Sequence, residues 1–415
     1  MDPTLHDWLN LLLRWFHMIA GIMWIGTSIF FHWLDNALER PEDKPEWLDG
    51  RLWMVHSGGF YKVEKVYLKP AELPPVLHWF VWEATFTWIS GFCLLVVVYY
   101  LGDAAFLIDA DVANLSQPTA VLYGIGSLVA GLVAYDLLWR TPLGKIAGGA
   151  PALVLSFAGL VAAAWGYSQV FSGRAAFIHT GALMGTCMVA NVWLHIVPSQ
   201  RGMVEATRLG QKADWTLGHA AKTRSRHNHY MTYLVLFIMI SNHFPMTYSA
   251  GWNWAVLAVL GIASGLVKYL VNVAEHGSHG GSSGSRRAVV GALAVTLVGV
   301  GIVYAMTKPE PPPTPSGPVA FADVAGIVQQ RCQTCHSARP TDDVYRLAPN
   351  GVMMDTPAQI QGFAARIQVR AVDQKSMPLV NKTCMTQAER DLLGRWIALG
   401  APVDLAAPAT QPTAR

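Results

Sequence analysis

The feature that most restricts the fold of this chain is a set of apolar segments, each long enough to cross a membrane. The hydrocarbon core of a bilayer is about 30 Å thick, and about 20 apolar residues span it as a helix. Because lipid cannot hydrogen-bond the backbone, such segments form helices. We therefore expect an all-α fold whose first part is a polytopic bundle of about eight transmembrane helices. These lie near residues 9–34, 78–101, 119–139, 146–170, 175–197, 229–248, 252–273 and 288–306.

The composition agrees with a protein that has the lipid bilayer as a partner. Of the 415 residues, 52% are hydrophobic and only 14% are charged, whereas soluble proteins carry about 25% charged residues. The net charge of +3 and the absence of a basic stripe argue against nucleic acid as a partner. The first apolar stretch lacks a basic leader and a small-residue cleavage site, so we expect it to be retained as a helix.

The distribution of Lys and Arg predicts the orientation in the membrane. The loops 35–77 and 198–228 carry six basic residues each, whereas the loop 102–118 carries three Asp and no basic residue. Basic loops stay on the cytoplasmic side. The pattern predicts a multi-pass protein of a bacterial inner membrane with both termini in the periplasm.

The chain changes character after the last apolar segment. Residues 308–315 read Lys-Pro-Glu-Pro-Pro-Pro-Thr-Pro, which is typical of a stiff polyproline spacer. We therefore divide the chain into a transmembrane domain (1–306), a proline-rich linker (307–319), a periplasmic domain (320–405) and a tail (406–415).

The periplasmic domain carries a haem attachment motif. Cys332-Gln-Thr-Cys335-His336 follows an amphipathic segment predicted to be helical from Phe321 to Arg331. Two thiols at this spacing each add to one haem vinyl group, and the adjacent His ligates the iron. The motif predicts one covalent haem c.

This domain also resembles class I cytochromes c. Met377, in Ser-Met-Pro, stands where that family places its distal iron ligand, and residues 386–399 resemble its closing helix. Met353 and Met354 are alternative distal ligands, because a Met elsewhere is often a flexible core residue.

Seven His lie in or at the ends of the predicted spans, where ionisable side chains are costly and usually functional. His229 and His243 are fourteen residues apart, which on one helix gives the same face and a separation of roughly 21 Å. We therefore predict one or two b-type haems. The preferred ligand pairs are His17 or His179 with His243, and His195 or His78 with His229. Alternatively, each His hydrogen-bonds a neighbouring helix or lies at an interface. The predicted layers are His17, His179 and His243 on the periplasmic side, and His32, His78, His195 and His229 on the cytoplasmic side.

Three further segments resemble one family. They are Trp53-Met-Val-His56-Ser-Gly-Gly-Phe-Tyr-Lys-Val-Glu64-Lys, Leu77-His-Trp-Phe-Val-Trp-Glu83-Ala-Thr-Phe-Thr-Trp and Asn191-Val-Trp-Leu-His-Ile-Val-Pro-Ser-Gln200-Arg201. Together with the C-x-x-C-H run, they are similar to membrane-bound bacterial urate oxidases with a C-terminal cytochrome c domain, over nearly the whole chain. The resemblance implies oxidation of urate to 5-hydroxyisourate, with electrons leaving through cytochrome c rather than forming H₂O₂. A downstream periplasmic cytochrome c or a terminal oxidase would accept them.

We predict that urate binds near the cytoplasmic face. Urate is a planar monoanion at neutral pH, and Arg201 with Gln200 offers a planar fork and an amide to hold it. Glu83 is the preferred base, because burial would raise its pKa; His56 and Glu64 are the next candidates. Alternatively, Arg201 is a positive-inside anchor and Glu83 is an ion-pair partner of Lys268. The polar residues in the cytoplasmic half of the spans are Glu83, Asp136, Asn191, Lys268 and Asn272.

Two other function classes fit parts of the sequence. One is a quinol–cytochrome c electron-transfer module without a urate site. The other is a transporter or sensor with a tethered cytochrome, which the absence of broken-helix repeats disfavours. A haem outside the membrane and candidate ligands within it favour electron transfer in either of the first two classes.

Overall fold

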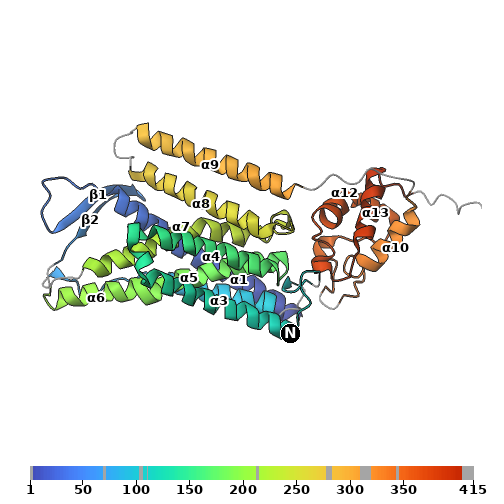
Figure 1. Ribbon diagram of the computed structural model, residues 1–415, viewed down its shortest axis with the longest axis horizontal. Helices are drawn as coiled ribbons and strands as arrows, with labels where there is room; N and C mark the ends of the chain where they lie inside the picture. Colours follow the sequence, from blue (N-terminus) through green and yellow to red (C-terminus); the bar gives the residue numbers. More distant parts are fainter. Residues whose placement is uncertain are drawn as a thin grey trace, which may run out of the picture.

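The structure is a computed structural model that describes residues 3–68, 72–101, 106–109, 111–211, 215–276, 283–308, 319–342 and 345–403. Figure 1 shows a bundle of long helices, with a β-hairpin at one end and a smaller helical domain beyond the other. We call these ends of the bundle the hairpin end and the domain end. The chain enters the bundle at the domain end, and α9 leads back to it before the C-terminal domain (Figure 1).

The bundle contains nine helices in the described residues, some of them continuous with one another. Seven helical stretches are long and apolar enough to cross a membrane, and they match seven of the eight predicted spans. Short 3₁₀ turns occur at Pro142–Gly144, Ile146–Gly149 and Pro245–Thr247. The helices are α1 (Pro3–Ala37), α2 (Trp82–Leu95) continuing into the π-helix η2 (Val96–Tyr100), α3 (Gln117–Arg140), α4 (Ala150–Ser168), α5 (Gly173–Ala190) continuing through the π-helix η6 (Asn191–Ile196) into α6 (Val197–Arg208), α7 (Trp215–Ser241), α8 (Asn253–His276) and α9 (Ser283–Thr307).

The remaining predicted span, 229–248, differs from the structure at both ends. Helix α7 begins at Trp215 and ends at Ser241, so His243 lies beyond it. The geometry that placed His229 and His243 on one helix face is therefore wrong. A polar first half, 215–228, explains why the apolar pattern placed the start of this helix too late.

The loop predicted at 198–228 is also largely helical. Pro198 has no backbone N–H, so the α-helical hydrogen bond to the carbonyl four residues earlier cannot form. The chain widens locally into η6, where the N–H of Val197 donates to the carbonyl of Val192, and then continues as α6. Such π-turns inside helices are often found at functional sites.

Helix α7 packs in the interior of the bundle, against α5, η6, α6 and α8. Leu234 and Ile238 are buried among apolar residues of the neighbouring helices. A Cβ on Gly181 would lie 2.8 Å from the side chain of Ile238, so glycine there allows α5 to approach α7 closely. In the polar first half of α7, Arg224 and Asn228 are also buried, whereas Lys222 and Arg226 are exposed.

The hairpin is a feature that the all-α prediction missed. Strands β1 (Leu48–His56) and β2 (Gly59–Val66) pair antiparallel, with His56 opposite Gly59. Between them, Ser57 and Gly58 have φ of 50° and 76°, as a two-residue type I′ turn requires. Ion pairs from Lys65 and Lys222 to Asp35 hold the hairpin and α7 to the end of α1.

The C-terminal domain is a separate helical unit around its own core, which includes the fully buried Trp396. The helix predicted at Phe321–Arg331 is confirmed as α10, and that predicted at 386–399 is α13, which Thr386 and Glu389 cap in a capping box. Its other helices are α11 (Pro357–Gly362) and α12 (Ala364–Ile367) leading into the π-helix η10 (Gln368–Asp373), with 3₁₀ turns at Pro349–Gly351 and Leu379–Asn381.

Candidate functional site

The C-x-x-C-H segment forms a tight turn directly after α10. The N–H groups of Cys335 and His336 both donate to the carbonyl of Cys332, at 3.2 and 2.8 Å. The imidazole of His336 donates from Nδ1 to the carbonyl of Val352 at 3.1 Å, which leaves Nε2 available to a metal, as in most His-ligated metal sites. Both thiols are free. These residues fit a covalently bound haem.

Burial shifts the pKa values of two residues of this motif. It raises the pKa of the Cys332 thiol to about 12 and lowers the pKa of His336, despite the hydrogen bond to Val352. A neutral imidazole is the form that ligates iron.

Of the three candidate distal ligands, Met377 is the most accessible. It is 36% exposed, whereas Met354 is packed in the core of the domain at 7%; Met353 is half-buried. Arg390 is itself buried and donates to the carbonyls of Met377 and Ala371, which fixes the backbone beside Met377. Met377 as the distal ligand stays a prediction.

The variant Met377→His is expected to retain covalent haem and to lower its reduction potential, because a thioether ligand stabilises reduced iron relative to an imidazole. Redox titration of the c-type absorbance measures the shift. The matched control is Met353→His, which should leave the potential unchanged. A shifted potential in the control alone would assign the ligand to Met353.

Three of the seven membrane histidines have protein partners that hold their rings. His179 is fully buried, donates from Nδ1 to the carbonyl of Ala175 and accepts at Nε2 from the hydroxyl of Tyr100, both at 2.8 Å. His17 lies 3.0 Å from the carbonyl of Thr87, and His195 lies 2.5 Å from Asp136. For these three, the alternative of hydrogen bonding to a neighbouring helix describes what the structure contains.

The other four histidines differ in exposure and in their ring contacts. His78 and His243 are exposed, His78 against Phe80 and His243 in the turn after α7. His32 on α1 and His229 on α7 lie side by side, with ring centroids 4.0 Å apart and ring planes 32° apart. Rings in direct contact leave no space for a porphyrin between them, and His179 has both nitrogens engaged. A haem b between His32 and His229, or one ligated by His179, therefore does not fit the structure. The other ligand pairs stay a prediction, and we derive no step through haem b.

The His32–His229 pair belongs to a polar cluster between α1, α7 and α8. The Nε2 of His32 and both ring nitrogens of His229 are buried without a hydrogen-bond partner in the described chain. Lys268 of α8 is 1% exposed, and its Nζ lies 5.6 Å from the ring centroid of Tyr233. We call His32, His229, Lys268 and Asn272 the histidine–lysine cluster; the Asn272 side chain interacts with His32 and donates to the hydroxyl of Tyr230 at 3.3 Å.

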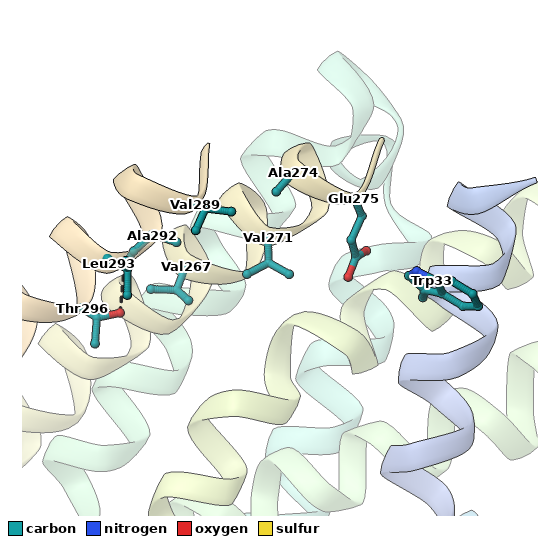
Figure 2. A pocket seen from close by; sticks show the side chains of 9 residues that line it. All are labelled: Trp33, Val267, Val271, Ala274, Glu275, Val289, Ala292, Leu293 and Thr296. Atoms are coloured by element: carbon teal, nitrogen blue, oxygen red, sulfur yellow. Dashed lines mark hydrogen bonds between the residues drawn. The ribbon is translucent and has the colours of Figure 1, made fainter. Parts of the chain in front are cut away.

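An apolar groove lies next to this cluster. Figure 2 shows it between α8 and α9, with Trp33 and Glu275 at one end. The groove has a volume of about 490 Å³, and Glu275 is the ionisable residue among those that line it. The carboxylate of Glu275 accepts a hydrogen bond from Asn36 at 3.4 Å. A groove of this kind suits an apolar molecule better than an anion with many polar atoms.

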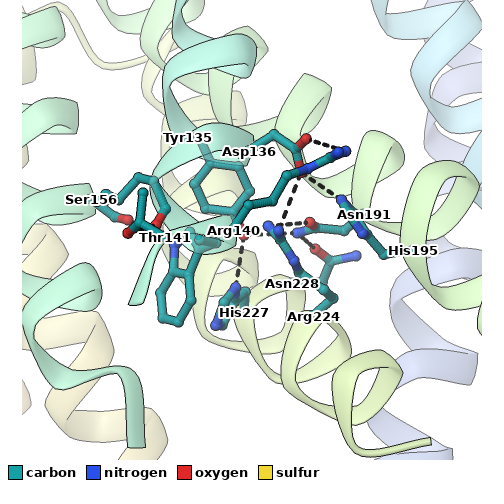
Figure 3. Close-up of polar contacts among 12 residues, drawn as sticks. Tyr135, Asp136, Arg140, Thr141, Ser156, Asn191, His195, Arg224, His227 and Asn228 are labelled. Atoms are coloured by element: carbon teal, nitrogen blue, oxygen red, sulfur yellow. Dashed lines mark hydrogen bonds and ion pairs between the residues drawn. The ribbon is translucent and has the colours of Figure 1, made fainter. Parts of the chain in front are cut away.

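A second polar cluster lies between α3, η6 and α7 near the hairpin end (Figure 3). Arg224 is 6% exposed and donates to Asp136 at 3.2 Å and to Asn191 at 3.3 Å. Asn191 in turn donates to Asn228 at 2.9 Å. Arg140, His195, Tyr135 and His227 complete what we call the Arg224 network.

The Arg224 network is saturated with internal bonds. Asp136 receives hydrogen bonds from His195, Arg224 and Arg140, and Asn228 donates to the carbonyl of Met188 at 2.9 Å. Each polar group already has a partner, which is typical of a network that fixes helix packing.

The five residues predicted to act on urate are not brought together. Arg201 and Gln200 are exposed on α6, with Arg201 lying 5.9 Å from the ring of Trp79. His56 is exposed at the hairpin turn and contacts Ser57, and Glu64 pairs with Lys62 at 2.6 Å. In the described chain, no hydrogen bond or ion pair joins any two of the five.

Glu83 alone among them has a buried polar atom. Its Oε2 has no hydrogen-bond partner in the described chain, and the suggested pairing with Lys268 is absent, since Lys268 lies over Tyr233. Its role as a base stays a prediction.

The sequence reasoning gave no role to five residues of the Arg224 network, which are Tyr135, Arg140, Arg224, His227 and Asn228. Arg224 was counted only as a cation of a cytoplasmic loop, and His227 and Asn228 were given no role. The spacing of four between Arg224 and Asn228, continued by Thr232 on the same buried face, was the available signal for an extended buried helix.

Comparison with known proteins gives one match. The family model described as urate oxidase N-terminal matches residues 3–303, which covers the helical bundle with its hairpin. Searches of curated proteins and of solved structures gave no match.

Proposed function

Because this chain belongs to the urate oxidase N-terminal family, we propose that it is a membrane-bound urate oxidase that passes electrons to a haem c in its own C-terminal domain. Membership of this family supports, in general terms, an oxidoreductase function related to urate. The observation that carries the finer proposal is the C-x-x-C-H turn, with two free thiols and a His336 imidazole whose Nδ1 is held by Val352.

The reaction balances with a one-electron acceptor used twice. The urate monoanion and one water give 5-hydroxyisourate, one proton and two electrons; the water oxygen bonds to C5 of urate. Bound haem c would supply the electron-accepting chemistry, so O₂ is not needed and H₂O₂ is not formed. The protein residues must bind the anion, orient it and take up the proton.

Several features support placing urate binding within the bundle, toward its hairpin end. The Arg224 network and the histidine–lysine cluster both lie in segments that the family model covers. The clustering of basic residues in the loops of that end supports a cytoplasmic location for it, with the C-terminal domain in the periplasm of a bacterial inner membrane. Electrons would then leave to a periplasmic cytochrome c or a terminal oxidase.

A second candidate function is quinol oxidation, which the apolar groove favours. A groove of about 490 Å³ lined by Val267, Val271 and Leu293, with Glu275 at one end, suits an isoprenoid tail and a polar headgroup. In this alternative the chain would be a quinol–cytochrome c module with no urate site.

The proposed function is tested by adding urate, or separately a quinol, to the purified full-length protein without O₂. Urate is expected to reduce the c-type absorbance, two haems for each urate consumed, and ¹⁸O from labelled water should enter 5-hydroxyisourate. Pyridine haemochrome analysis of the same sample counts haems b and c. Reduction by quinol with no response to urate would establish the second candidate instead.

A further inference from the structure

We infer that the histidine–lysine cluster is where the urate anion binds, with Lys268 supplying the charge and His229 and His32 the ring contacts. The inference rests on the proposed function, because that function supplies the substrate. It moves the substrate contact from exposed Arg201 on α6 to the interface of α1, α7 and α8.

The unpartnered ring nitrogens are the first observation. Buried polar atoms in folded proteins almost always have a hydrogen-bond partner, and those that lack one call for a ligand, an ion or a water. Here three such atoms lie together: Nε2 of His32 and both ring nitrogens of His229, a residue that is 2% exposed. Imidazole nitrogens donate or accept according to the tautomer, so they match both the N–H and the carbonyl edges of urate.

The charge of Lys268 is the second observation. Its side chain is 1% exposed, and in the described chain no carboxylate lies within 4.0 Å of its Nζ. A buried ammonium without a counter-ion in direct contact is unfavourable. Glu275 lies seven residues along α8, on the same helix face and roughly 10 Å away along the axis. It attracts Lys268 electrostatically but forms no ion pair with it within 4.0 Å in the described chain, and it accepts a hydrogen bond from Asn36. A monoanion at the cluster would compensate the charge of Lys268 directly.

The flat surfaces around the cluster suit a planar ligand. The rings of His32 and His229 are in contact, with centroids 4.0 Å apart and planes tilted by 32°, and the ring of Tyr233 lies beneath Lys268. Tyr230 and Asn272 add a hydroxyl and an amide at the same interface. A purine anion would therefore meet aromatic faces, a cation and polar edges in one place.

Each of the two alternative locations for a urate site lacks one of these properties. The Arg224 network contains a buried cation, but Asp136 already neutralises it, and its amides are bonded to one another. Arg201 is exposed, so water weakens any charge interaction that it makes.

The test measures urate affinity without turnover. The full-length protein is held reduced with dithionite, so that haem c accepts no electrons, and urate binding is measured by titration calorimetry. Lys268→Met and His229→Gln are compared with Lys145→Met and His219→Gln, which replace exposed residues of the same types. Arg201→Lys is measured alongside. Haem c content and thermal unfolding confirm that each variant is folded.

We expect Lys268→Met and His229→Gln each to weaken urate binding at least tenfold, with the two controls and Arg201→Lys within twofold of the parent. Parental affinity in both Lys268→Met and His229→Gln, or a loss confined to Arg201→Lys, would overturn the inference. If Lys268→Met does not fold, Lys268→Gln replaces it. Failure of the proposed function looks different, since the parent protein would then bind or oxidise no urate at all.

Discussion

Replacing Cys332 and Cys335 together with Ala is expected to remove all covalently attached haem from the protein. The two thiols are free and stand at the spacing of the two haem vinyl groups, so no other pair in the domain can replace them. Haem staining of a denaturing gel, or the intact mass of the protein, measures the loss. Urate should then no longer produce a c-type absorbance change.

The matched control for this double variant is Cys384→Ser, because Cys384 is an exposed, free cysteine of the same domain. It should keep full covalent haem. Supplying ferricyanide to the double variant tests whether the bundle oxidises urate independently of haem c. Urate oxidation with this soluble electron acceptor should persist, since the bundle is intact. Haem that survives denaturation in the double variant would exclude attachment at the C-x-x-C-H motif.

Replacing Arg224 with Met is expected to destabilise the bundle by about 3–5 kcal/mol, the usual cost of removing one partner from a buried ion pair. Arg224 contacts Asp136 and Asn191 and lies 5.3 Å from the ring centroid of Tyr135. Its loss leaves polar groups of α3 and η6 facing an apolar side chain of α7. Thermal unfolding in detergent, followed by tryptophan fluorescence, should shift by on the order of 10 °C.

Two further variants make this prediction specific. Arg226→Met, two residues along the same helix and exposed, should leave the unfolding temperature unchanged. Adding Asp136→Asn to Arg224→Met should recover little of the loss, because Arg140 and His195 still pair with Asp136 when Arg224 is absent. If Arg224→Met kept parental stability but lost urate affinity, the Arg224 network rather than the histidine–lysine cluster would be the urate site.

The features that could be predicted from the sequence are those that depend on the residues of a single contiguous segment. Seven apolar segments correspond to long apolar helices, and α10 has the predicted bounds. The C-x-x-C-H motif specifies its own chemistry, because the spacing of its thiols is fixed by three consecutive peptide units. The hairpin could also have been found, since Ser57-Gly58 between strand-forming residues is a local turn signal.

The start of α7 was missed for a physical reason. A membrane span is recognised by the mean hydropathy of its residues, and residues 215–228 carry Lys, Arg, Asn and His. Of these, Arg224 and Asn228 are buried and bonded to Asn191 of η6, whereas His219, Lys222 and Arg226 are exposed. Hydropathy measures the mean affinity of a segment for lipid, so this polar part of α7 fell outside the predicted span.

The sequence by itself determined that the chain forms long apolar helices and carries a motif for covalent haem, because both depend on residues close together along the chain. Only the tertiary structure decided which polar side chains are buried and with what partners. The contact between His32 and His229 requires α1 to pack on α7, and the burial of Arg224 requires α3 and η6 to pack on the same helix. Sequence reasoning assigned Arg201 to urate binding and counted Arg224 only among the basic residues of the loop 198–228. Whether an arginine or a lysine faces solvent or the interior is set by helix packing, and packing energy depends on residues that are distant in the sequence.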